Sequence, residues 1–298
     1  MNGVAAHLRG VGKDYRYFSL DDIHLDIPEG HIVGFIGPNG AGKSTTIRIL
    51  MGLVHQDRGE VSVLGHRMPV GQAAAKRDIG FASEDMRLYE SETLDWHLRF
   101  IRSIYEAWDE DYARTLVKRF DLKPQQRMKG LSHGQRTKAM LLLVLARRPR
   151  LLLLDEPTTG LDPVARHEVL RELTDLLTHE GRSVLFSSHN TQDVEQISDQ
   201  ITFIDRGRIV ESRDKETFLE RWRRVRVEVP SGVRLPALAG VVELRQDGHL
   251  AVATTNAYAA ELPHVYEAVG ARVHSVERMT LEEIFVASVQ HSREGARA

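Results

Sequence analysis

Short apolar runs separated by helix-like repeats dominate the first two thirds of the chain. Continuous apolar runs of this length are typical of parallel strands that are covered on both faces. The runs are 32–36, 79–82, 151–154 and 183–186. After the later runs, apolar residues recur every three to four positions over 164–178 and 191–197 and predict helices. This alternation predicts an α/β fold with a mostly parallel sheet.

A helical block interrupts the alternation, because apolar residues recur at helical spacing over Ser91–Tyr105 and again over Asp111–Phe120. A further apolar helix is predicted over Met140–Ala146. We therefore expect a helical subdomain over about residues 84–148, inside a first domain of residues 1–218. We interpret the aromatic residues of the block as core rather than contact surface. They are Trp96, Phe100 and Trp108.

The remainder of the chain, residues 219–298, changes to short alternating segments. Strands are predicted over Val225–Val229, Val241–Arg245, Leu250–Thr254 and Arg272–Val276, with helices over Tyr258–Val269 and Leu281–Val289. This pattern predicts a small α+β domain, and it carries no motif with a recognisable chemistry. Near the other end, His7–Val11 predicts a short strand, and Gly65–Val70 predicts a turn.

The composition and charge of the chain limit the classes of partner that it is expected to bind. The formal net charge of −2 and the pI near 6.7 give no broad field that would attract nucleic acid or an anionic membrane. The absence of cysteine excludes disulfides and thiolate metal sites, and it fits a reducing cytosol. Met1–Arg9 is too polar for a signal peptide, and no apolar run is long enough to span a bilayer. We therefore expect any membrane function to depend on another chain.

A phosphate-binding loop follows the first apolar run and opens a helical pattern over Thr46–Met51. The stretch satisfies G-x-x-x-x-G-K-[ST], in which glycines let backbone N–H groups surround an anion. Lys43 is expected to pair with the β- and γ-phosphates, and Ser44 to offer its hydroxyl to Mg²⁺. The complete stretch is Gly37, Pro38, Asn39, Gly40, Ala41, Gly42, Lys43, Ser44 and Thr45.

Two carboxylates at the end of a later buried run indicate hydrolysis of the nucleotide. Asp155 and Glu156 follow Leu151–Leu154 at the strand end where ligands sit in parallel sheets. We expect Asp155 to hold Mg²⁺ through water and Glu156 to polarise a water aimed at the γ-phosphate. His189 follows the run at 183–186, so its ring can either reach the γ-phosphate or fill a structural role.

An aromatic residue upstream of the loop is a candidate for the purine. Tyr15 is placed to stack on the base, with Tyr17 as the alternative. A half-buried tyrosine at a strand end is the other interpretation of Tyr15. The remaining thirteen histidines show no metal-ligand spacing.

Taken together, these motifs resemble those of ABC-type ATPases in order and spacing over about residues 4–212. The resemblance covers the Walker A, signature, Walker B, D-loop and switch-histidine motifs. The corresponding segments are Gly37–Thr45, Leu131–Gln135, Leu151–Glu156, Gly160–Asp162 and His189. Within this family, the chain looks most like the ATP-binding subunit of bacterial ABC-2 type exporters. The segments that carry this likeness are Pro38–Ala41, Thr158–Pro163 and Leu281–Phe285.

The resemblance implies an ATP- and Mg²⁺-dependent ATPase that works as a head-to-tail homodimer. Each ATP would lie between the phosphate loop of one copy and the signature of the other, with Ser132, Gly134, Gln135 and Asp162 among the binding residues. It also implies a separate transmembrane permease at the cytoplasmic face of the cell membrane, docked on the helical subdomain, and no nucleic acid. The transported substrate would be selected by the permease.

Two positions depart from the family pattern. His133 stands where the signature usually has a glycine, so its side chain must either contact the phosphate or point away from it. Glu84 stands where a glutamine usually follows the strand at Phe81. A carboxylate there can ligate Mg²⁺ but cannot donate a hydrogen bond to water. The alternative for Glu84 is a solvated loop acid.

Two other functions compete with the exporter subunit. One is a soluble ABC-type ATPase that acts on nucleic acid or ribosomes, and the other is a regulator without turnover. ABC-type ATPases that act on nucleic acid or ribosomes have a long coiled coil, zinc cysteines or a second cassette, and this chain has none of them. An intact Glu156 argues against a regulator without turnover.

Overall fold

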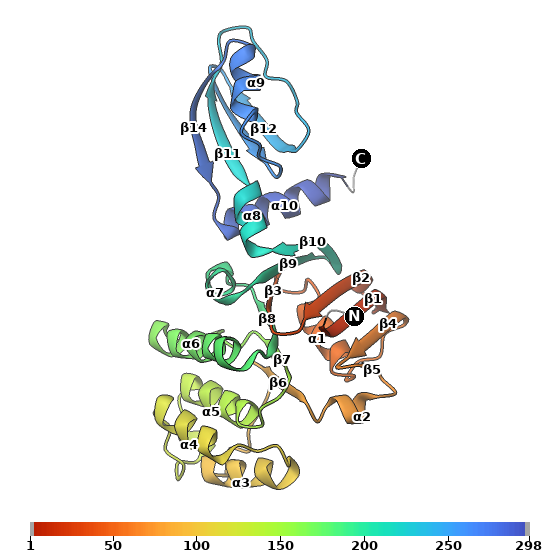
Figure 1. The fold of residues 1–298 in the computed structure, drawn as a ribbon, viewed down its shortest axis with the longest axis vertical. Helices are drawn as coiled ribbons and strands as arrows, with labels where there is room; N and C mark the ends of the chain where they lie inside the picture. The colour runs from red at the N-terminus through yellow and green to blue at the C-terminus, as the bar shows by residue number, and fades with distance from the viewer. Residues whose placement is uncertain (1–2, 296–298) are drawn as a thin grey trace. The chain divides into compact units, whose positions relative to one another are not determined.

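The computed structural model describes residues 3–295, apart from the side chains of 176–180. The chain forms two compact units, one ending at Ile209 and the other beginning at Val210 (Figure 1). Within the described residues, no helix combines the length and hydrophobicity that a bilayer crossing requires.

A six-stranded sheet with the order β10-β9-β3-β8-β7-β6 forms the centre of the first unit. The strands from β9 to β6 run parallel to one another. Every residue of β3, β7 and β8 is buried, because both faces of the sheet are covered. The bounds are β3 (Ile32–Ile36), β6 (Ile79–Ser83), β7 (Leu151–Asp155), β8 (Ser183–Ser188), β9 (Gln200–Asp205) and β10 (Arg208–Asp214).

One face of the parallel sheet carries helix α1 (Lys43–Leu50) and an antiparallel sheet, while the other carries α6 (Pro163–Glu180) and α7 (Thr191–Ile197) (Figure 1). The antiparallel sheet has the order β2-β1-β4-β5. Its strands are β1 (Val4–Asp14), β2 (Ser19–Pro28), β4 (Arg58–Val63) and β5 (His66–Arg67), and the short α2 covers Gln72–Ala75.

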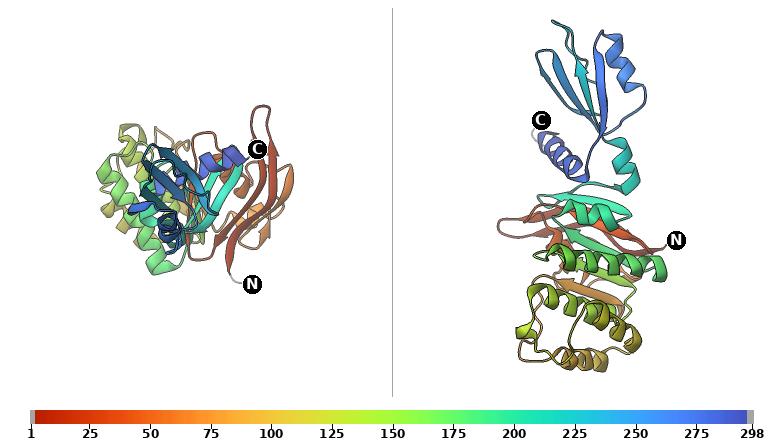
Figure 2. Two further views of the ribbon diagram at one scale, coloured as in Figure 1. Left: turned by 90° about the horizontal axis from the view of Figure 1, so that it is seen from above. Right: turned by 90° about the vertical axis from the view of Figure 1, so that its left-hand side faces the viewer.

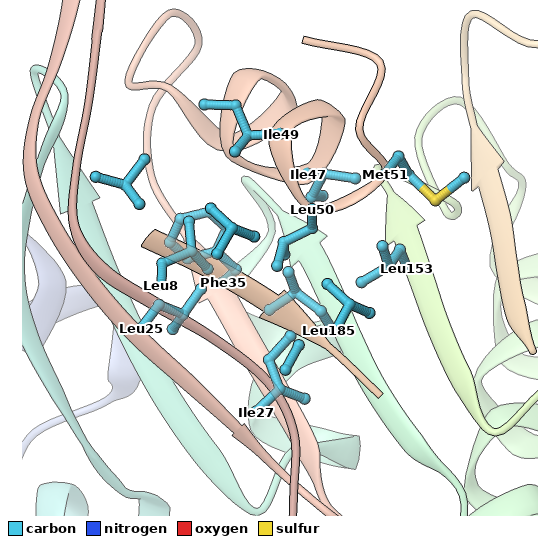
Figure 3. Packing of buried hydrophobic residues seen from close by; sticks show 14 of the residues in the cluster. Leu8, Leu25, Ile27, Phe35, Ile47, Ile49, Leu50, Met51, Leu153 and Leu185 are labelled. Carbon is cyan, nitrogen blue, oxygen red and sulfur yellow. The ribbon is translucent and has the colours of Figure 1, made fainter. Parts of the chain in front are cut away.

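The core of the first unit lies between these two sheets and α1. Figure 3 shows Leu8 and Ile27 of the antiparallel sheet facing Phe35 and Leu185 of the parallel sheet, with Ile47 of α1 beside them. These five side chains are fully buried, and each such burial stabilises the fold by roughly 1.5–3 kcal/mol relative to exposure. The same packing fixes α1, and therefore the loop that precedes it.

The helical block between β6 and β7 gathers at one end of the first unit, as both views in Figure 2 show. Each of the three α-helices in this block begins at a residue whose side chain accepts a backbone N–H, namely Thr93, Asp109 and Ser132. At α5 the cap is a capping box between Ser132 and Gln135. The elements are α3 (Leu94–Ile104), α4 (Glu110–Arg119), η1 (Met128–Gly130) and α5 (His133–Leu145).

The second unit is a four-stranded antiparallel sheet with the order β12-β13-β11-β14. Val225, Val227 and Ala253 point to one face, where Tyr266 of α9 packs on them. The elements are α8 (Lys215–Arg221), β11 (Arg223–Glu228), β12 (Val241–Asp247), β13 (Leu250–Thr255), α9 (Leu262–Ala268), β14 (Arg272–Arg278) and α10 (Leu281–Gly295).

The α/β fold expected from the sequence is confirmed, and three local predictions are wrong. The strand predicted over His7–Val11 runs from Val4 to Asp14, because both β2 and β4 pair along it. The predicted turn at Gly65–Val70 contains β5. Phe100 was expected in the core, yet its ring is 42% exposed, stacked on Trp96 at 5.1 Å between ring centres.

Candidate functional site

The phosphate-binding loop connects β3 to α1, and two of its glycines are required by close packing. At Gly42 the backbone is left-handed, with φ of 115°, and a Cβ would lie 2.5 Å from Leu20. At Gly37 a Cβ would lie 2.5 Å from the carbonyl oxygen of Ile204. The loop therefore fits tightly against β2 and β9, and its N–H groups are held at the N-terminus of α1, where an anion is stabilised.

Lys43 is the first residue of α1, and its ammonium group bends back over the loop. Its Nζ donates to the carbonyl oxygen of Gly37 at 2.6 Å and to that of Pro38 at 3.3 Å. It also forms an ion pair with Glu156 Oε1 at 3.1 Å, and the two side chains are only 6% and 13% exposed. A charge this well buried is suited to bind an anionic phosphate.

The side chain of Glu156 contacts both Lys43 of the phosphate loop and His189, which follows β8. Its Oε2 accepts from His189 Nδ1 at 2.8 Å and from Thr159 Oγ1 at 3.0 Å. Its Oε1 is buried and, among the described residues, has only the ion pair with Lys43. Burial raises the pKa of Glu156, but Lys43 and His189 outweigh that effect and leave the pKa below its ordinary value. The carboxylate is therefore ionised at neutral pH, with Oε2 held by His189 and Thr159 and Oε1 paired with Lys43.

The backbone at Glu156 is strained, with φ of 54°, which is uncommon for any residue other than glycine. Its N–H donates to the hydroxyl of Ser187 at 3.1 Å, and the same hydroxyl donates to Asp155 Oδ1 at 2.7 Å. Ser187 therefore fixes both acidic residues at the end of β7.

The residues expected to hold Mg²⁺ come from neighbouring strands and from α1. Glu84 directly follows β6, and its N–H donates to the carbonyl oxygen of Asp155 at 3.2 Å. Ser44 lies in the first turn of α1, which packs on β7. Among the side chains that the structure describes, no three histidine, aspartate or glutamate residues gather as a metal site. One hydroxyl and two carboxylates nevertheless fit Mg²⁺, which usually keeps several waters and binds phosphate oxygens.

Tyr15 is connected to the loop through another ring. It stacks on Phe18 with 6.4 Å between ring centres, and Phe18 approaches Gly42 so closely that a Cβ there would lie 3.0 Å from its ring. Tyr15 is 46% exposed and Tyr17 is 86% exposed. A base stacked on Tyr15 would therefore rest on an aromatic pair anchored at the phosphate loop.

The signature residues form a separate group. Ser132 is exposed and caps α5, while Asp162 Oδ1 caps α6 by accepting from the N–H groups of Val164 and Ala165, each at 3.0 Å. These bonds hold the pKa of Asp162 below its ordinary value. Among the described residues, no hydrogen bond or ion pair joins Ser132, Gly134, Gln135 or Asp162 to the phosphate loop.

Three residues at the site escaped the sequence analysis: Phe18, Thr159 and Ser187. Each contacts a predicted residue through the tertiary fold. Thr159 lies within the segment Thr158–Pro163, but its bond to Glu156 is not visible in the sequence, and Phe18 and Ser187 belong to no motif. For Ser187 a weak signal exists, since a small polar residue ends the buried strand next to the acidic one.

Comparison with known proteins places this architecture among transport ATPases. The family model described as ABC transporter matches residues 20–159. An uncharacterized ABC transporter ATP-binding protein of Bacillus subtilis, YdbJ, is 30% identical and covers 97% of each chain. The Nod factor export ATP-binding protein I of Rhizobium johnstonii is 34% identical over 72% of this chain and 70% of its own. A solved ATP-binding subunit of an ABC transporter matches with a TM-score of 0.67 at 28% identity, over 72% of this chain and 92% of its own.

Proposed function

Because this chain belongs to the ABC transporter family, as an ATP-binding subunit with ATPase chemistry, we propose that it drives a separate permease of the ABC-2 exporter type. The observation that carries the ATP-driven part of this proposal is the convergence of Lys43, Glu156 and His189 at the phosphate loop. The name of the Rhizobium relative supports export, since that protein is described as a Nod factor export ATP-binding protein. The subunit would then act at the cytoplasmic face of the membrane through its permease.

The site supports hydrolysis by attack of water on the γ-phosphate. Lys43 binds phosphate oxygens, and Glu156 Oε1 accepts a hydrogen bond from the attacking water and polarises it. His189 holds Glu156 through Oε2, while Oε1 is paired with Lys43 and would become free for the water once phosphate oxygens bind that ammonium group. Tyr15 provides the surface for the base. Ser44, Asp155 and Glu84 would hold Mg²⁺, whose charge offsets that of the triphosphate.

A head-to-tail dimer would complete each site. Ser132 and Gly134 lie at the start of α5, where N–H groups and the helix dipole favour a γ-phosphate. Because Ser132 is exposed and not bonded to its own phosphate loop, it is available to the ATP of a second copy. ATP would hold two copies together, and its hydrolysis would let them separate.

An exposed apolar surface on the helical block is the proposed docking site for the permease. Tyr89, Phe100 and Ile104 are 64%, 42% and 55% exposed. Beside them a cavity of about 260 Å³ is lined mostly by apolar residues, which include Leu88 and Ile101, together with Lys76 and Arg147. A short amphipathic helix at the cytoplasmic side of a permease would lay its apolar face on this surface and insert a side chain into the cavity.

The docking proposal predicts that Phe100→Asp combined with Ile104→Asp abolishes membrane association. The full chain, tagged and recovered from detergent-solubilised membranes of its source, should carry a multispanning protein that increases its ATPase rate. The double variant should lose both the protein and the stimulation. Val70→Asp is the control, because Val70 is 91% exposed and lies outside this surface. Recovery of nucleic acid or ribosomal proteins instead would contradict the exporter function.

Glu84 gives a second prediction. If its carboxylate ligates Mg²⁺, Glu84→Gln should raise the Mg²⁺ concentration for half-maximal ATPase activity by about tenfold, because affinity for hard cations follows the charge of the ligands. The melting temperature should not change, since Glu84 is exposed. Glu90→Gln, an exposed acid on the same loop, is the matched control. A Mg²⁺ profile equal to the wild type would identify Glu84 as a solvated loop acid.

A further inference from the structure

The imidazole of His133 is exposed, yet it also contacts its own chain. Its Nε2 lies 3.0 Å from the carbonyl oxygen of Thr159. Because a carbonyl only accepts, Nε2 must carry the proton and donate. The ring also lies over Gly160, where an added Cβ would come within 3.1 Å of Nε2 and where φ is +71°. The residue that replaces the usual glycine therefore binds the segment that follows the catalytic glutamate.

Thr159 continues this connection to the reaction centre. Its carbonyl oxygen accepts from His133, and its hydroxyl donates to Glu156 Oε2 at 3.0 Å. Its N–H also donates to the carbonyl oxygen of Glu156 at 3.3 Å. One residue thus joins the signature to the carboxylate that polarises water, and it does so at the oxygen that also binds His189.

Further contacts keep the start of α5 close to the same segment. A Cβ at Gly134 would lie 3.5 Å from Ala165 and 3.8 Å from Leu161. One turn further along α5, Lys138 forms an ion pair with Glu168 of α6. A displacement of the signature therefore has a direct route to the residues around Glu156.

We propose that His133 and Thr159 form a positioning link that couples the two ATP molecules of the dimer. The inference rests on the proposed function, in which the signature of one copy contacts the ATP of its partner while Glu156 acts on its own ATP. When Ser132 closes on the partner's γ-phosphate, His133 shifts with the start of α5 and moves the Thr159 carbonyl. The Thr159 hydroxyl then fixes Glu156 Oε2, which orients Oε1 for hydrolysis.

The first test measures the ATP dependence of hydrolysis by the full chain. The wild type should show positive cooperativity with a Hill coefficient near 2, the limit for two sites, and His133→Gly should lower it toward 1. His133→Gln keeps an N–H donor at similar reach and should restore cooperativity, which a merely structural role would not require. The proposal is overturned if the wild type shows no cooperativity or if His133→Gly retains it.

The second test addresses the other half of the link. Thr159→Val keeps the carbonyl that accepts from His133 but removes the hydroxyl, so it should also lower the Hill coefficient, whereas Thr159→Ser should preserve it. Combined with His133→Gly, Thr159→Val should cause no further loss, because both changes break one pathway. Additive losses would contradict the link.

ATP-driven dimerisation separates this inference from the proposed function. In a Glu156→Gln background, His133→Gly should still form a dimer with ATP and Mg²⁺, because Ser132 and the α5 N-terminus remain. A dimer with unchanged cooperativity of hydrolysis in the single variant overturns only the link. Absence of any ATP-dependent dimer overturns the dimeric function and the link with it.

Discussion

Glu156→Gln is expected to stop ATP turnover and to accumulate the protein as an ATP-bound dimer. The amide keeps the size of the side chain, and its oxygen can still accept from His189 and Thr159 at the position of Oε2. The other oxygen is replaced by an NH₂ group, which cannot accept a hydrogen bond from the attacking water. Loss of a general base typically lowers the rate by about 10²- to 10⁴-fold.

The charge change also favours retention of the nucleotide. In the wild type, Glu156 is a buried anion paired with Lys43, and an approaching triphosphate must compete for that ammonium group. Glutamine removes this competition, so Lys43 is available to phosphate oxygens and ATP affinity should rise. Because the γ-phosphate is not cleaved, the contacts that hold two copies together persist.

Size-exclusion chromatography with light scattering, with and without ATP and Mg²⁺, measures this outcome. The variant should be a monomer without nucleotide and a dimer with ATP, whereas the wild type should return to monomer as ATP is consumed. The Lys43→Ala/Glu156→Gln double variant should remain monomeric and serves as the control. A Glu156→Gln protein that stays monomeric with ATP would contradict the shared site.

The phosphate loop could be predicted because its chemistry needs particular residue types in one continuous stretch. Gly37 and Gly42 illustrate this. A Cβ at position 37 would clash with the carbonyl oxygen of Ile204, and the backbone at position 42 is left-handed, so neither position readily accepts another residue. The same holds for the acidic end of β7, where a fully buried apolar run makes two adjacent carboxylates conspicuous.

Contacts made across the sheet could not be predicted in this way. The hydroxyl of Ser187 joins Asp155 and Glu156 only because β8 lies beside β7, and the sequence does not contain that register. Phe18 is a similar case, because its ring packs on Gly42 and stacks on Tyr15, and neither contact can be read from the sequence. The roles of the candidate residues in catalysis and binding therefore stay predictions that the variants test.

The sequence also left the direction of His133 open, between contact with the phosphate and a position away from it. A histidine in place of glycine at the start of a helix has several rotamers, and the choice depends on what lies beside it. The structure places the ring on Thr159 and Gly160, where a carbonyl oxygen and a residue without a side chain receive it. Only the folded segment after β7 supplies this acceptor.

Lys43→Ala is expected to abolish ATP binding and to destabilise the protein at neutral pH. The ammonium group is the one cation that contacts Glu156 Oε1 among the described residues, and removing one partner of a buried pair typically costs about 3–5 kcal/mol. Loss of the contacts to the triphosphate should lower ATP affinity by at least about 100-fold, equivalent to roughly 3 kcal/mol for a charge-assisted contact. Isothermal titration with ATP and chemical unfolding measure the two effects.

The pH dependence of the stability loss distinguishes electrostatics from packing. In the wild type the pKa of Glu156 lies below its ordinary value of 4.5, so the carboxylate stabilises the fold above that pH and this contribution is lost as the pH falls through the folded pKa. In Lys43→Ala the lowering effect of Lys43 is lost while the burial remains, so we expect the pKa of Glu156 to rise. The ionised carboxylate then destabilises the variant at neutral pH, and protonation relieves the cost as the pH falls.

The difference in unfolding free energy between wild type and Lys43→Ala should therefore shrink steadily from pH 7 toward pH 4, and it should be nearly absent in a Glu156→Gln background. Lys118→Ala is the control, because Lys118 is exposed on α4 and lies outside the phosphate loop. A difference that is constant over this pH range would assign the loss to packing of the lysine stem. Unchanged ATP affinity in Lys43→Ala would contradict the contact assigned to its ammonium group.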